Sequence, residues 1–105
     1  MKIFKVKQKE SKTLFLAITH GGVVLNLTDS TLTLQVYDKN KVLKIEKVDN
    51  DFDKTEAIVG EVTVLLDGTD LDLEPETYKG YAKIVVGSLI DKTIEFNLIV
   101  RSSLI

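Results

Sequence analysis

The chain has 105 residues, of which 44% are hydrophobic and none is cysteine, and its formal net charge at pH 7 is −2. This length favours one domain over residues 1–105, with enough apolar residues for one core. The absence of cysteine excludes disulfides, thiolate chemistry and cysteine-ligated zinc. The acidic balance gives no general affinity for nucleic acid, and no apolar run approaches the roughly 20 residues of a membrane span.

The apolar residues follow the pattern of β-strands. Val, Ile, Leu and Thr dominate the sequence while Ala is scarce, and this composition favours pleated structure. Strict alternation in residues 31–37 and 92–101 predicts strands with one buried face. In chain order we expect about eight strands, at residues 2–7, 13–19, 23–27, 31–37, 42–48, 57–66, 78–86 and 92–101.

Turn residues separate these runs. Gly21-Gly22 predicts a tight hairpin, because glycine accepts the positive φ that such turns need. Residues 38–41 predict a second turn, and residues 49–55 and 67–76 predict longer acidic loops, with a single helical turn at residues 69–73. Short, regular strand spacing without a long helical segment predicts an all-β fold, an antiparallel β-sandwich.

Residues that could carry catalysis are scarce. His20 is the only histidine, and it stands beside the turn glycines. A nucleophilic triad also needs a serine in a sharp strand-to-helix turn, and no serine of this sequence has that context. We therefore expect no catalytic residue and no cofactor-binding residue, and the chain is not expected to be an enzyme.

The acidic loops raise the question of a metal ion. Three aspartates alternate over residues 49–53, as at the start of a calcium-binding loop. The sixth position of such a loop needs glycine for its sharp turn, and the twelfth needs a bidentate glutamate. Here these positions hold Lys54 and Gly60. The sequence therefore predicts no metal site, and the second acidic stretch at residues 67–74 is interpreted as a solvated loop.

The segment that leads into the strand at residues 78–86 has the composition of a structural corner. Leu73, Pro75 and Tyr78 follow one another in the run Leu-Glu-Pro-Glu-Thr-Tyr. Proline presets a turn dihedral, and a tyrosine that opens the next strand can return its hydroxyl to an upstream backbone group. Pro75 and Tyr78 are therefore predicted to form a tyrosine corner. The other interpretation is an ordinary loop with a core tyrosine.

The C-terminal end carries more apolar residues than one sheet face can bury. Leu98 and Ile99 are neighbours in a strand, so their side chains point to opposite faces. Ile99, Leu104 and Ile105 are therefore predicted to contact another chain, either a second copy or a different protein. The alternative is that Ile99 is an isolated surface residue and that Leu104 and Ile105 form a frayed tail.

Several short motifs occur in a characteristic order. They are Gly21-Gly22, Leu27-Thr28, the alternating strand at residues 31–37, Gly60-Glu61-Val62-Thr63-Val64 and Leu73-Glu74-Pro75-Glu76-Thr77-Tyr78. Together they resemble the N-terminal domain of phage baseplate upper proteins and related immunoglobulin-like tail domains of phages of Gram-positive bacteria. That family has a glycine where this chain has Glu76, which leaves the type of this turn open.

The resemblance implies a virion structural module, which attaches or assembles tail or baseplate parts through protein–protein surfaces. Such a module would be made in the host cytoplasm and would bind other virion proteins or copies of itself, with no nucleic acid, membrane or cofactor as partner. The alternative is a free-standing module that binds a carbohydrate or another ligand. Exposed aromatic residues in a concave patch would favour that alternative, but the sequence offers few. Tyr81, between Lys79 and Lys83, can stack on a sugar, and the favoured interpretation is an ordinary cross-strand pair.

Overall fold

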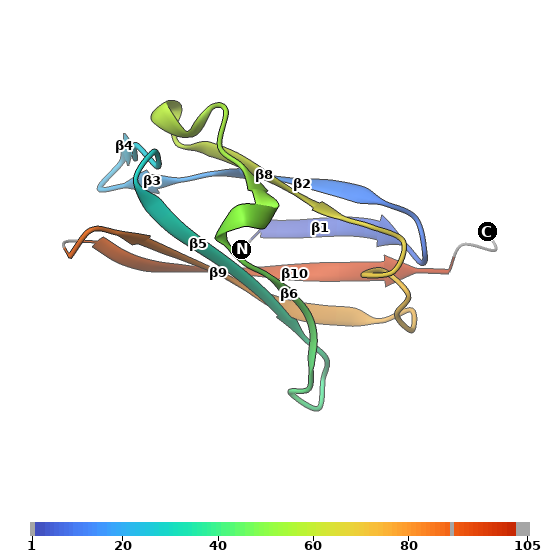
Figure 1. Cartoon of the computed structure of the whole chain (residues 1–105). Coiled ribbons are helices and arrows are strands. Elements are labelled where there is room, and N and C mark those ends of the chain that lie inside the picture. The colour runs from blue at the N-terminus through green and yellow to red at the C-terminus, as the bar shows by residue number, and fades with distance from the viewer. Residues whose placement is uncertain (1, 89, 103–105) are drawn as a thin grey trace.

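A computed structural model describes residues 2–88 and 90–102, and almost all of its regular structure is β-strand (Figure 1). Two short 3₁₀ turns, η1 (Asp49–Asp51) and η2 (Ala57–Val59), interrupt the strands. The strands of the described part are β1 (Lys2–Lys7), β2 (Lys12–Ala17), β3 (Thr19–His20), β4 (Val23–Val24), β5 (Ser30–Tyr37), β6 (Leu43–Lys47), β7 (Phe52–Asp53), β8 (Glu61–Leu66), β9 (Thr77–Val86) and β10 (Ile90–Arg101).

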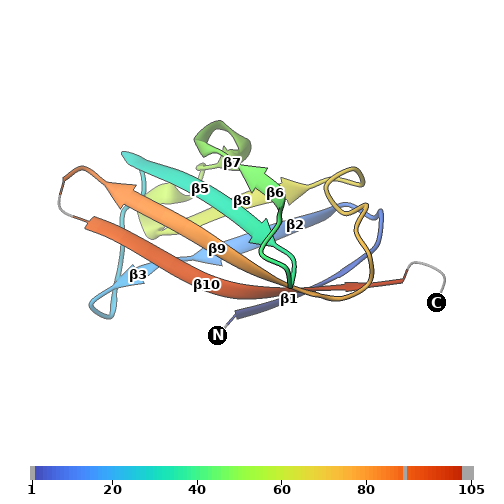
Figure 2. The same cartoon turned by 90° about the horizontal axis from the view of Figure 1, so that it is seen from below.

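The strands form two facing sheets and one small hairpin (Figures 1 and 2). The larger sheet has five strands in the order β1-β10-β9-β5-β6, and the smaller sheet has the order β2-β8-β7. Immunoglobulin-like sandwiches likewise divide their strands between two sheets, ABED and CFG, but here the first strand, β1, joins the sheet of the last strand, β10. The all-β sandwich predicted from the sequence is therefore confirmed.

One strand pair departs from the antiparallel prediction. Strand β1 pairs with β10 in parallel, with Phe4 opposite Leu98 and Val6 opposite Val100. The pairing is long-range, between the first and the last strand, and local turn residues do not determine its direction. Phe4 stabilises it by packing edge-on against Phe96, with the ring centroids 5.4 Å apart. Strand β1, with its lysines, lies at the edge of the sheet, as its sequence predicts.

The core lies between the sheets and follows the alternation of the sequence. Leu32, Leu34 and Val36 of β5 are buried, and so are three alternate residues of β10, Phe96, Leu98 and Val100. Gly80 lies directly opposite Phe96 in the β9–β10 pair. A Cβ atom at Gly80 would lie 2.1 Å from the Cζ atom of Phe96, so the phenyl ring occupies the space that a side chain would need.

The predicted strand at residues 57–66 is wrong in its first part. Only Glu61–Leu66 is strand, and Ala57–Val59 forms the turn η2. Gly60 separates them with φ of +77°, a left-handed conformation in which a strand cannot continue. A Cβ atom at Gly60 would lie 2.7 Å from the carbonyl oxygen of Ile18, so the chain passes too closely there for any other residue.

The boundaries of two other predicted strands also differ. Residues 13–19 and 23–27 were expected as long strands of one hairpin, but β2 ends at Ala17, and β3 and β4 have two residues each. The strands are short because backbone groups of this segment form hydrogen bonds with residues outside the hairpin. The Ile18 N–H donates to the Gly60 carbonyl at 2.8 Å, and the Leu27 N–H donates to the Ala57 carbonyl at 2.8 Å. The turn at Gly21-Gly22 is present as predicted, with positive φ at both residues.

Candidate functional site

One end of the sandwich gathers three connections, which we call the loop end: residues 18–29, 54–60 and 87–88. In Figure 1 the β3–β4 hairpin, η2 and the turn after β9 lie together at the left. The backbone bonds from Ile18 to Gly60 and from Leu27 to Ala57 join the first two connections. Lys92 of β10 donates a hydrogen bond to the carbonyl oxygen of Thr19, which attaches the hairpin to the larger sheet.

Four apolar side chains project from the loop end, and we call them the apolar tip: Val23, Val24, Ile58 and Val59. Their exposed fractions lie between 47% and 68%. Val24 also lies close to the second connection, because a Cβ atom at Gly60 would be 2.9 Å from its Cγ1 atom. The hairpin and η2 therefore both expose apolar side chains at this end of the sandwich, on segments joined by backbone hydrogen bonds.

The sequence did not identify this surface. Reading residues 57–66 as one strand assigned Ile58 and Val59 to the sheet, where η2 instead exposes them. Gly60 was the available signal, because a glycine before an alternating apolar strand often marks a left-handed break. The exposure of Val23 and Val24 follows from the shortness of β4, which the sequence alone did not reveal.

The predicted corner lies at the opposite end of the sandwich. Tyr78 is buried at the start of β9, and its hydroxyl donates to the carbonyl oxygen of Glu74 at 2.7 Å. Burial raises the pKa of Tyr78 to about 12, and the charges of nearby carboxylates, chiefly Glu76, act in the same direction. Pro75 is exposed in the bend between the two groups. The geometry is that of a tyrosine corner.

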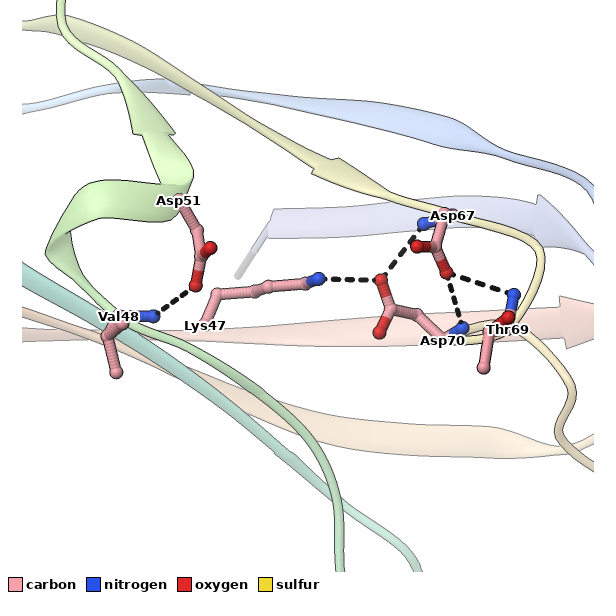
Figure 3. Close-up of polar contacts among 6 residues, drawn as sticks. All are labelled: Lys47, Val48, Asp51, Asp67, Thr69 and Asp70. Carbon is pink, nitrogen blue, oxygen red and sulfur yellow. Dashed lines mark hydrogen bonds and ion pairs between the residues drawn. The ribbon is translucent and has the colours of Figure 1, made fainter.

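The acidic residues of the 67–76 loop bind their own backbone (Figure 3). One carboxylate oxygen of Asp67 accepts the N–H groups of Thr69 and Asp70 at 2.9 and 2.8 Å. Asp70 accepts the Asp67 N–H at 2.9 Å and pairs with Lys47 at 2.7 Å. The helical turn predicted at residues 69–73 is not a helix: a single turn lies two residues earlier, where the Leu71 N–H donates to the Asp67 carbonyl at 3.0 Å.

The aspartates at residues 49–53 are engaged in the same way. Asp49 accepts the Leu32 N–H at 2.9 Å and pairs with Lys54 at 2.7 Å, and the lysine holds the pKa of Asp49 below its ordinary value. Asp51 accepts the Val48 N–H at 2.8 Å (Figure 3). Among residues 2–88 and 90–102, no group of three or more His, Cys, Asp or Glu side chains is placed to hold a metal ion.

The residues predicted to contact another chain are only partly described. Ile99 lies on the outer face of the larger sheet, between Lys5 of β1 and Thr77 of β9, and it is half-buried. Its neighbours Leu98 and Val100 are buried in the core, so neighbouring residues of this strand point to opposite faces, as predicted. Leu104 and Ile105 lie outside the described residues. His20 is exposed in β3.

The outer face of the larger sheet brings together residues that are far apart in the sequence. Tyr37 of β5 and Tyr81 of β9 lie edge to face, with ring centroids 6.0 Å apart. Lys79 lies beside Tyr37, and Lys83 lies beside Thr33. Tyr81 was the aromatic residue that the sequence singled out, whereas its partner Tyr37 was not recognised, because the β5–β9 register decides the pairing.

No protein-family model matches the sequence, and no curated protein matches it. Among solved structures, the chain is similar to a crystal structure from Bacteroides vulgatus ATCC 8482, of a protein described provisionally as a glycoside hydrolase. The TM-score is 0.49 and the sequence identity 14%, and the match covers 94% of this chain and 17% of that chain. In the part of the chain that the structure describes, no helix is long and apolar enough to cross a membrane.

Proposed function

We propose that the chain is a non-catalytic attachment module of a phage or prophage particle and that it binds a neighbouring virion protein through its loop end. The observation that supports this role best is the apolar tip. Soluble domains rarely present several large apolar side chains together unless the surface contacts something. Burying a valine or isoleucine side chain is worth about 2 kcal/mol, so four such side chains can anchor a specific contact.

The backbone of the tip supports the same role. The hydrogen bonds of Ile18 with Gly60 and of Leu27 with Ala57 hold the hairpin against η2 before any partner arrives. A preorganised surface loses little conformational entropy on binding. The connections between strands are also the part of a sandwich that varies without loss of the fold, as the binding loops of antibody domains do.

The setting of the proposal comes from the motifs that resemble phage baseplate domains. In that family the sandwich works through surfaces and carries no chemistry. The carboxylates of Asp49, Asp67 and Asp70 are occupied by backbone N–H groups and lysines. They therefore serve the loops that contain them, which agrees with a structural role.

The proposal is tested on particles from the organism that encodes the chain. Induced particles are purified by density-gradient centrifugation and probed with an antibody against the chain. We expect the chain in the particles, and we expect Ile58→Lys to lower its incorporation at least tenfold. Leu65→Lys is the matched control, because Leu65 is also exposed, on the outer face of the smaller sheet. Absence from the particles, or full incorporation of Ile58→Lys, would show that the proposal is wrong.

A second copy of the chain as partner is tested separately, at the residues that the sequence suggested. Light scattering compares the full chain with a shortened chain that ends at Arg101 and carries Ile99→Lys. If Ile99, Leu104 or Ile105 mediates self-association, the full chain has the larger mass and the shortened variant is monomeric. Monomers in both samples would remove the support for self-association through this end and leave a different virion protein as the partner.

A further inference from the structure

An open groove lies on the outer face of the larger sheet, beside the β5–β6 turn and away from the apolar tip. Its volume is about 560 Å³, within the range of roughly 300–1,000 Å³ that is usual for ligand sites. The register places Tyr81 opposite Gln35 and Lys79 opposite Tyr37, so aromatic and polar groups alternate across two neighbouring strands. The groove is lined by Gln35, Tyr37, Asp38, Lys39, Lys41, Lys79 and Tyr81.

The polar groups of the groove are held in place by one another. The Tyr37 hydroxyl donates to Oε1 of Gln35 at 3.0 Å, and Nε2 of Gln35 donates to Oε2 of Glu46 at 2.7 Å. These two hydrogen bonds orient the Gln35 amide and the Tyr37 ring, and Tyr81 packs against that ring. The remaining lone pairs of Gln35 and Glu46 can accept hydrogen bonds from hydroxyl groups.

The lining is positively charged in a chain whose net charge is −2. The lining contains one carboxylate, that of Asp38, and three lysines, Lys39, Lys41 and Lys79. Asp38 is already engaged with the turn, because it accepts the N–H groups of Asn40 and Val42 at 2.8 and 3.0 Å. The hydrogen bond from Val42 is the main cause that holds the pKa of Asp38 below its ordinary value. The lysines therefore leave a net positive rim.

Lys41 occupies an unfavourable backbone position at this rim. Its φ is +64°, in the left-handed region that glycine and asparagine adopt at lower cost. The two hydrogen bonds to Asp38 fix the turn that imposes this conformation. These bonds hold the backbone of Lys41 at the rim of the groove before a ligand binds.

We propose that this groove binds an acidic saccharide, a sugar that carries one carboxylate or phosphate group. A sugar ring stacks on the face of Tyr81, with the Tyr37 ring beside it at a steep angle. Its anionic group contacts Lys41 and Lys79, and its hydroxyls donate to Gln35 and Glu46. The proposal is independent of the virion role, because it uses a different face of the molecule.

The charges around the groove also limit what can bind. Glu46 neighbours Gln35, and Glu95 of β10 lies opposite Tyr81. These two carboxylates border the side of the groove away from the lysine rim, where they repel an extended polyanion such as a nucleic acid. A ligand with one anionic group and several hydroxyls satisfies both sides.

The test is a titration of the isotope-labelled full chain, followed by two-dimensional ¹H–¹⁵N spectra. The probes are 3′-sialyllactose, which has a carboxylate, and glucose 6-phosphate, which has a phosphate. Lactose and inorganic phosphate are their controls. We expect shifts at Gln35, Tyr37, Lys79 and Tyr81 with at least one acidic sugar, with affinity at least tenfold above that of the corresponding control. The two acidic sugars together show which anionic group the site prefers.

Variants locate the binding. Lys41→Asn removes a charge and keeps the backbone conformation, and Tyr81→Leu removes a ring, so each is expected to weaken binding about tenfold. Lys9→Asn is the control for the first, because Lys9 also has positive φ, at 63°, and lies outside the groove. Lys83→Gln is a control on the same strand. Equal binding of lactose or inorganic phosphate, equal losses in the control variants, or no shift with either acidic sugar would overturn the proposal.

Discussion

The two ends of the sandwich treat their exposed residues in opposite ways. The end opposite the loop end, which we call the corner end, contains residues 8–11 and 67–76 and lies at the right in Figure 1. There the side chains of Asp67, Asp70 and Tyr78 are bonded to backbone groups. At the loop end four apolar side chains are exposed, and backbone hydrogen bonds join the hairpin connection to residues 57–60.

This difference indicates that one end stabilises the fold and that the other is available for contacts. At the corner end, polar side chains replace the strand partners that the loop backbone lacks, so their loss should lower the stability of the fold. At the loop end, the apolar tip contributes little to the fold, because its side chains are half or more exposed in most cases. Stability and contact with partners are therefore expected to depend on different residues.

Removing the ring of Tyr78 should have the largest effect. Tyr78→Ala leaves a cavity in the corner end and is expected to cost about 3–5 kcal/mol of unfolding free energy. Tyr78→Phe keeps the ring and loses the hydrogen bond to Glu74, at about 1 kcal/mol. Urea denaturation measures both values. A melt unchanged by Tyr78→Ala would contradict the tyrosine corner.

The pH dependence of stability should reveal the same hydroxyl. The pKa of Tyr78 is about 12 in the folded chain and about 10 in an unfolded one, so folding favours the neutral form. Its contribution is complete below pH 10 and is lost as the pH rises from 10 to 12. We expect up to about 3 kcal/mol of stability to disappear over this interval. Tyr78→Phe is the control, because the other tyrosines affect both proteins equally and only the wild type has the Tyr78 hydroxyl. If the two curves of unfolding free energy against pH run parallel from pH 10 to 12, Tyr78 is not the group responsible.

The acidic loop at the corner end should show a smaller effect. Asp70→Ala removes both the acceptor of the Asp67 N–H and the partner of Lys47, so we expect a loss of about 1–2 kcal/mol. Asp70→Asn keeps an acceptor and should cost less. Urea denaturation of the two variants beside the wild type measures both losses.

Calcium should leave the Tm of the wild-type chain where a chelator leaves it, because a ligand that binds only the native state must stabilise it. A calcium-dependent rise in Tm would show that these carboxylates bind the ion instead.

Local patterns predicted the parts of the fold that depend on neighbours in the sequence. Alternation identified Leu32, Leu34 and Val36 as buried, and paired glycines identified the turn at Gly21-Gly22. The segment around Pro75 was found because proline and tyrosine have fixed conformational roles at a corner. Each of these signals lies within a few residues of the feature that it predicts.

Features that depend on distant strands were not predicted. The parallel partner of β1 is the last strand, and the groove needs the register of β5 with β9. Residues 57–59 were misassigned because Ala-Ile-Val suits a strand locally. Tertiary contacts decide otherwise: Ala57 is buried and accepts the Leu27 N–H, and Gly60 turns the chain away. The candidate surfaces are therefore the part of the molecule that the sequence indicated least.

The smallest effect on stability is expected at the apolar tip, and it provides the sharpest contrast between the two ends. Ile58 is 67% exposed, so Ile58→Lys removes little burial and should change the unfolding free energy by about 0.5 kcal/mol or less. Ile99→Lys alters a half-buried side chain and should cost more, about 1 kcal/mol, although both substitutions are chemically the same. Urea denaturation of the two variants beside the wild type measures the difference. A loss of 2 kcal/mol or more in Ile58→Lys would place Ile58 among the residues that hold the fold, and the separation of stability from contact between the two ends would then be wrong.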